Sequence, residues 1–87
     1  MHKIKCLIPT KAAAEEMMDL NLHISDIGYI LKNGLDLGKR GKGVVEKGVI
    51  KGKKIIKVVC VEMDNYIKVI HVGEISYTKK FKRIFSR

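Results

Sequence analysis

Apolar and polar residues follow two different periods along this chain, and the change between them separates a helical part from a strand-forming part. Residues 3–8 alternate Lys with apolar side chains, which is typical of a strand, and Pro9 ends it. Residues 11–20 are almost wholly strong helix formers, with apolar residues at spacings i, i+4 and i+7 on one face. Thr10 is placed to cap this first helix.

A second helix is expected after a break at residues 21–24. Ser25 is a good N-cap, and Asp26 favours the positive end of the helix that follows. Asn33 and Gly34 end the helix, with Gly34 suited to the left-handed position beyond a helix C-terminus. Two short helices joined by a few residues predict a helical hairpin.

Beyond this point the period becomes that of strands. Residues 38–43, GKRGKG, are expected to form a flexible basic loop or an irregular strand. Three strands joined by tight turns follow over 44–50, 54–63 and 66–72. The second of these is apolar on both faces, which is typical of a central strand covered on both sides. The pattern therefore predicts an α+β fold, β-α-α-β-β-β, in which an antiparallel sheet carries the helical hairpin on one face.

The 87 residues are expected to form one domain, with a core over 3–72 and a basic tail over 74–87. The tail pattern fits a short amphipathic helix, or an arm that orders only on a partner. No apolar run approaches the roughly 20 residues of a membrane-spanning helix. The start of the chain is too short and too charged for a signal peptide, so we expect a cytoplasmic protein that does not bind membranes.

The cysteines and histidines do not have the spacing of a metal site, and the chain has no complete nucleotide-binding glycine motif. We therefore expect no metal and no cofactor. Cys6 and Cys60 lie in apolar stretches, where a reduced cysteine behaves as a small buried hydrophobe. A disulfide between them would require their two strands to be neighbours.

The net charge of +9 is concentrated in the second half of the chain. Residues 1–38 carry four basic and five acidic side chains, whereas residues 39–87 carry fourteen basic and four acidic ones. This asymmetry is typical of a surface that binds a polyanion or an acidic protein, although a solvated Lys-rich face gives the same composition. The candidates for nucleic-acid binding are Lys39, Lys42, Lys51, Lys53, Lys54, Lys57, Lys79, Lys80, Lys82 and Arg83.

Metal-independent cleavage of RNA needs a group that takes the 2′-hydroxyl proton and cations that stabilise charge on the phosphate oxygens. We select Arg40, His71 and Tyr77 as candidate catalytic residues. His71 is either an acid, a base or a phosphate contact, or else a half-buried strand residue. Tyr77 either meets RNA or packs on the core. A passive RNA-binding domain would carry the same residue types, so the residues alone leave enzymatic activity open.

The stretch from Leu20 to Gly34, LNLHISDIGYILKNG, resembles a motif of small bacterial and archaeal domains grouped with the RelE/ParE-like toxins. In those domains a first helix ends in a short link, an acidic-capped second helix follows, and an L-x-N-G sequence closes it before basic antiparallel strands. The resemblance covers about residues 3–72. It implies a toxin-type module that cleaves mRNA and whose basic sheet face is covered by an acidic antitoxin when inactive.

The resemblance further implies that dispersed Lys and Arg residues act together with a C-terminal Tyr or His. By position these are Arg40, Lys53, Lys54, His71, Tyr77 and Arg83. The chain departs from the family in its first helix, which lacks the His and Arg often found there. We therefore expect a module that acts on RNA or the ribosome, with two alternatives: a non-catalytic RNA- or ribosome-binding module, and a protein-interaction domain for an acidic partner.

Overall fold

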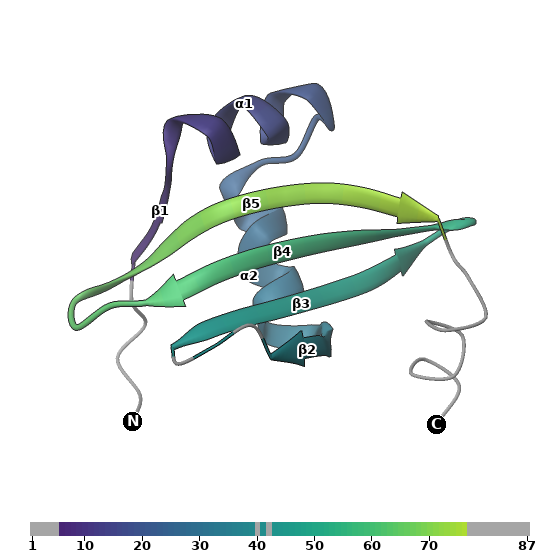
Figure 1. The fold of residues 1–87 in the computed structure, drawn as a ribbon. Coiled ribbons are helices and arrows are strands. Elements are labelled where there is room, and N and C mark those ends of the chain that lie inside the picture. Colours follow the sequence, from purple (N-terminus) through teal and green to yellow (C-terminus); the bar gives the residue numbers. More distant parts are fainter. Residues whose placement is uncertain (1–5, 40, 42, 77–87) are drawn as a thin grey trace.

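The computed structural model describes residues 6–39, 41 and 43–76 of the chain. These residues form two helices and one five-stranded sheet with the strand order β1-β5-β4-β3-β2 (Figure 1). The α+β class predicted from the sequence is confirmed. The elements are β1 (Cys6–Pro9), α1 (Lys11–Asp19), α2 (Ile24–Asn33), β2 (Leu35–Lys39), β3 (Val44–Lys51), β4 (Lys54–Glu62) and β5 (Tyr66–Ser76).

The sheet differs from the expected four-stranded antiparallel one in an additional edge strand, β2, and in the pairing of β1. β2, β3, β4 and β5 pair antiparallel in succession, but β1 pairs in parallel with β5, with Cys6 opposite Tyr66 and Pro9 opposite Val69. A parallel pair needs a long connection, and here all the other elements lie between the two paired strands. The sheet is therefore mixed, and β5 lies between the first strand and β4.

Two strands differ in extent from the prediction. The glycine-rich stretch at 38–43 is a strand only at its start, because Gly38 and Lys39 belong to β2, which has a register shift between Asp36 and Gly38. Gly41 and Gly43 lie in a bend and a turn, and residues 40 and 42 lie outside the described residues. β5 continues to Ser76, past the predicted end at Val72, and pairs with β4 over its whole second half. Residues 77–87 of the predicted tail lie outside the described residues.

β4 is the central strand, as its apolar sequence predicts, and side chains are buried on both of its faces. Ile56 and Val58 belong to the core beneath the helices, whereas Ile55 and Val59 point to the opposite face. All four are 3% exposed or less. β5 separates β1 from β4, so Cys6 and Cys60 are on strands that are not neighbours, and both are free thiols.

The first helix begins where the sequence predicts and the second begins earlier. The Thr10 hydroxyl accepts the backbone N–H of Ala13 at 3.1 Å, which caps α1. The cap of α2 is His23 rather than Ser25, because the Asp26 carboxylate accepts the backbone N–H of His23 at 2.8 Å. This is one half of a capping box, in which the acidic side chain reaches back three residues to the cap.

Gly34 ends α2 for a reason other than the predicted left-handed conformation. Its φ is −72°, a value open to any residue. Instead, there is no room for a side chain, because a Cβ here would lie 2.5 Å from the Ile30 carbonyl oxygen and 2.9 Å from that of Gly48. The last turn of α2 thus lies directly against the backbone of β3.

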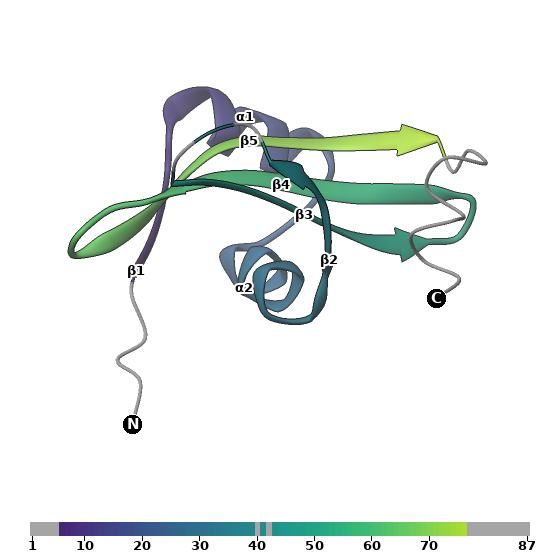
Figure 2. The same ribbon diagram turned by 60° about the horizontal axis from the view of Figure 1, so that its bottom comes forward.

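The two helices occupy different places on the sheet. α2 crosses one face of the sheet, and Figure 2 shows it nearly end-on beside the strands. α1 lies beside β5, past the end of β1 (Figure 1), where the backbone N–H of Thr10 donates to the Val69 carbonyl at 2.9 Å. Both contribute to one core, made of Ala13, Met17, Ile27, Ile30, Ile56, Val58, Val69 and Val72. The prediction that the helices pack on one face of the sheet therefore holds for α2, whereas α1 covers the edge of the sheet along β5.

Neither helix in the described ranges is long and apolar enough to span a lipid bilayer.

Candidate functional site

A carboxylate on α1 and a histidine on β5 form the main polar contact between the helical and the sheet parts. The Glu16 carboxylate accepts the backbone N–H of Val72 at 3.0 Å, and its two oxygens lie 3.1 and 2.8 Å from Nδ1 of His71. β1 ends opposite Val69, so Glu16 replaces a neighbouring strand as the acceptor for this part of β5. A carboxylate can only accept, so the proton of a neutral His71 ring is on Nδ1.

A β-bulge in β5 gives the histidine its direction. Val59 of β4 pairs with His71 while the next residue, Cys60, pairs with Val69, so Ile70 is an extra residue in β5. In a regular strand, Val69 and His71 are two residues apart and their side chains would point to the same face. With Ile70 inserted, Val69 and Val72 both point into the helix-side core, and His71 points to the opposite face.

The same opposite face carries an ion pair that is mostly excluded from solvent. Nζ of Lys57 lies 3.3 Å from Oε1 of Glu46, and the two side chains are 15% and 12% exposed. Lys57 pairs in register with Gly73 of β5. Such a pair contributes little net stability, because its desolvation offsets the attraction between the charges.

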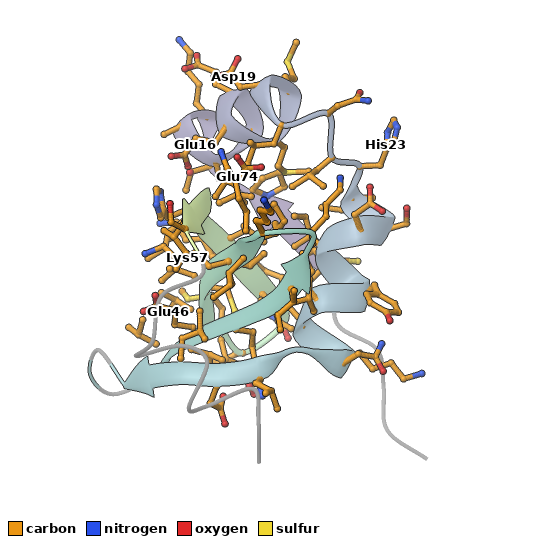
Figure 3. The ribbon with its side chains drawn as sticks, turned by 90° about the vertical axis from the view of Figure 1, so that its right-hand side faces the viewer. Glu16, Asp19, His23, Glu46, Lys57 and Glu74 are labelled. Atoms are coloured by element: carbon orange, nitrogen blue, oxygen red, sulfur yellow. The ribbon has the colours of Figure 1, made fainter. Side chains whose placement is uncertain are left out.

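Gly73 brings the histidine and the lysine together. A Cβ at this position would stand 3.2 Å from Nε2 of His71 and 3.9 Å from Cε of Lys57. Because glycine has no side chain, the imidazole ring and the lysine stem share this space. Glu16, His71, Lys57 and Glu46 thus form a polar row across α1, β5, β4 and β3. Figure 3 shows Glu16, Lys57 and Glu46 on one side of the molecule, and α2 with His23 at its start on the other.

The polar row has the groups that a proton-transfer site requires. The His71 side chain is 43% exposed, and within the described part of the chain its Nε2 has no hydrogen-bond partner. A carboxylate on Nδ1 fixes the ring and stabilises the imidazolium form, which leaves Nε2 to accept or donate a proton. The neighbouring ammonium group of Lys57 can stabilise negative charge, although Glu46 already balances part of its charge.

Of the three catalytic candidates from the sequence, only His71 lies among the described residues. Arg40 and Tyr77 lie outside them. So do five of the candidate RNA contacts, and of Lys39 only the backbone, in β2, is described. The five are Lys42, Lys79, Lys80, Lys82 and Arg83.

The basic stretch that is continuous in sequence is divided in the structure. Lys51, Lys53 and Lys54 are exposed at the turn between β3 and β4, where Lys54 pairs with Glu74 at 2.9 Å. The backbone of Lys39, which pairs with Val45, is at the other end of β3, about 23 Å away for a strand of this length. Lys57 contributes to the polar row instead. The candidates that the structure describes between 39 and 57 therefore do not form one continuous patch.

The excess positive charge of the sequence falls on residues outside the described ranges. Residues 6–39, 41 and 43–76 carry nine basic and nine acidic side chains, so they are balanced. All nine surplus cations of the sequence fall at residues 1–5, 40, 42 and 77–87. Long-range attraction of a polyanion must therefore come from these segments, together with the exposed lysines of the β3–β4 turn.

The sequence analysis did not identify Glu16, Glu46 or Gly73 as site residues. The position of Glu16 on α1 could have indicated its role, because it lies three residues after Ala13 and therefore near the buried side of the helix. A glutamate there needs a polar partner. The pattern could not say that this partner is on β5, because that depends on how α1 meets the sheet.

Nowhere in the described ranges do three His, Cys, Asp or Glu side chains gather closely enough to hold a metal ion.

Comparison with known proteins adds no assignment: no protein-family model, no characterised protein and no solved structure matches this chain. The function must be inferred from the residues of the site.

Proposed function

We propose that this chain is a RelE-like, toxin-type module of the cytoplasm that acts on RNA, and that it cleaves the RNA backbone without a metal. The observation that supports this most strongly is the Glu16–His71 pair. Its imidazole is bound through Nδ1, belongs to a partly exposed side chain, and lies beside the side chain of Lys57. These are the groups that transesterification of RNA requires from a protein.

In the proposed reaction the 2′-oxygen of the RNA attacks the adjacent phosphorus, and the 5′-oxygen of the next nucleotide leaves. Nε2 of His71 takes the 2′-hydroxyl proton, and Glu16 stabilises the imidazolium that forms. A second acid protonates the leaving oxygen, for which Tyr77 is the candidate from the sequence. The products are a 2′,3′-cyclic phosphate and a 5′-hydroxyl.

RNA would be drawn to the site by the exposed lysines of the β3–β4 turn and by the surplus cations outside the described ranges, rather than by the polar row itself. Lys51 and Lys53 are exposed and form no ion pair with any described residue. The surplus cations of the terminal segments and of Arg40 and Lys42 add to them. The affinity for RNA should then fall steeply with salt concentration, because each neutralised phosphate releases counterions.

The test is incubation of the purified protein with end-labelled mRNA in EDTA, with and without ribosomes. His71→Gln should reduce the rate of cleavage by about a hundredfold or more, the usual contribution of a general acid or base. Glu16→Gln should cause a smaller loss, because the imidazole ring then lacks the carboxylate that holds Nδ1. The matched control is His23→Gln, because His23 is exposed and lies on the other side of the molecule (Figure 3). Unchanged cleavage by His71→Gln would refute the proposed role of His71.

A second candidate function is a non-catalytic RNA- or ribosome-binding module. It is favoured by the location of the surplus charge, since binding through the terminal segments would not need the polar row. In that case intact RNA would be retained in a salt-dependent manner, and His71→Gln would leave the affinity unchanged.

A further inference from the structure

The face of the sheet opposite α2 has an apolar centre, although no helix of the described ranges crosses it. Figure 1 looks onto this face, with α2 behind the strands. Ile55 and Val59 of β4 point to it, both are fully buried, and neither belongs to the core beneath the helices. A sheet face that meets water carries polar side chains, whereas buried apolar ones indicate a second layer on that side.

The second layer has to cover more than one place on this face. Leu37 of β2 approaches Ile55, because both side chains come within 3.0 Å of the place where a Cβ on Gly48 would stand. Val59 lies four residues further along β4, about 13 Å away, and is equally buried. The Lys57–Glu46 ion pair on the same face is also mostly excluded from solvent. Leu37 therefore explains the burial at one end of the apolar strip, and Val59 needs a cover of its own.

The described part of β5 ends beside this strip. Ile55 pairs in register with Ile50 of β3 and with Ile75 of β5, so three isoleucines form a row across the face. The next residue, Ser76, is the last one before the eleven residues 77–87. This segment therefore starts at the row of isoleucines, on the edge of the face that needs a second layer.

The sequence of residues 77–87, YTKKFKRIFSR, is that of an amphipathic segment. Phe81, Ile84 and Phe85 have the i, i+3 and i+4 spacing of one helix face, and five basic residues surround them without an acidic one. A helix of eleven residues is about 16 Å long. The distance along β4 from Lys54, which pairs with Ser76, to Val59 is also about 16 Å. The segment is therefore long enough to reach Val59.

We propose that residues 77–87 fold back onto this face and form its second layer, with the rings of Phe81 and Phe85 packed on Ile55 and Val59. Charge favours this occupant, because the polar row has two carboxylates against one ammonium group while His71 is neutral. An acidic partner would be repelled by the same carboxylates. The docked segment also brings its five basic residues to the face that bears His71. Only the use of these cations for RNA rests on the proposed function; the docking itself does not.

The test is NOE spectroscopy on the full chain with labelled methyl groups and without RNA. NOEs are expected between the rings of Phe81 and Phe85 and the methyl groups of Ile55 and Val59. Contacts of the rings with Ile27 beneath α2 instead, or no contacts with the sheet, would overturn the proposal. A mixed sample of labelled and unlabelled chains identifies the source of the contacts. NOEs found only between chains would show that a second copy occupies the face, which also contradicts the proposal.

A matched pair of double variants tests the docking by stability. Phe81→Ser with Phe85→Ser should lower the midpoint of thermal unfolding by about 5 °C or more, because two aromatic side chains lose their burial. Lys79→Ser with Lys82→Ser keeps the apolar residues and should change the midpoint by less than about 2 °C. Equal midpoints for the two variants would contradict the docking.

The NOE measurement on the unchanged chain decides the question even where the Phe variant does not fold. Cleavage of RNA is measured separately, with His71→Gln. The docking and the proposed RNA function can therefore fail independently of each other.

Discussion

The carboxylate of Glu16 binds the imidazole of His71 and the backbone N–H of the next residue, although 55 residues separate the first pair in sequence. A single side chain thus both orients the candidate catalytic ring and completes the hydrogen bonding of a strand that has no neighbouring strand there. The geometry of the site and the attachment of α1 therefore depend on the same carboxylate.

This double role predicts a measurable cost when the carboxylate is removed. Glu16→Ala leaves the N–H of Val72 and Nδ1 of His71 without their acceptor, and we expect a loss of about 1 kcal/mol of unfolding free energy, since both groups are partly reached by water. The measurement is urea unfolding followed by circular dichroism. Glu15→Ala, on the exposed side of the same helix, should change the free energy by less than about 0.5 kcal/mol.

The close contact between α2 and β3 predicts opposite effects for two glycine substitutions. Gly34→Ala forces a Cβ to within 2.5 Å of the Ile30 carbonyl and should cost about 2–4 kcal/mol. Gly28→Ala meets only Leu7, at 3.6 Å, and should stabilise the helix by up to about 1 kcal/mol. Equal midpoints for the two variants in thermal unfolding would contradict the described approach of α2 to the sheet.

The ion pair between Lys57 and Glu46 should show strong coupling in a double-mutant cycle. Replacing either residue alone, as Lys57→Met or Glu46→Gln, leaves a poorly solvated charge and should cost about 1–3 kcal/mol. The double variant should cost much less than the sum of the two. Chemical denaturation of the four proteins gives the coupling energy, and simple additivity would show that the pair is not formed in solution.

The two free thiols should react at different rates. Cys6 is exposed, whereas Cys60 is 4% exposed and its pKa is raised, chiefly by burial. A raised pKa leaves less thiolate at a given pH, so labelling of Cys60 should accelerate only at a higher pH than labelling of an ordinary cysteine. Labelling reactions quenched at successive times and analysed by mass spectrometry, at several pH values, give the rate for each cysteine. A Cys60 that reacts as fast as Cys6 at neutral pH would contradict its burial.

Local signals in the sequence predicted most of the elements. Thr10 caps α1, β4 is central and buried on both faces, and the turns at residues 52–53 and 64–65 lie where the pattern places them. Contacts between distant segments were not predictable in this way. The parallel pairing of β1 and the space that requires glycine at 34 both depend on how separate elements meet.

The candidate site was predicted only in part, for a similar reason. His71 was selected by residue type and position, but its direction depends on the extra residue Ile70 and its partner on the docking of α1. The basic stretch from 39 to 57 looked like one surface because its residues are consecutive. β3 and β4 distribute them over two ends and two faces of the sheet.

The pairing of β1 with β5 also limits the order in which the elements can fold while the chain is being synthesised. The first strand of the chain has no partner until residues 66–69, opposite Cys6–Pro9, have been synthesised. α2 and the hairpins of β2 to β4 depend on nearby sequence and can form as the chain emerges, whereas β1 cannot pair, and α1 cannot dock, before β5 has been made. Closure of this edge therefore cannot precede the synthesis of β5, and it is the step that brings Glu16 to His71 and so assembles the candidate site.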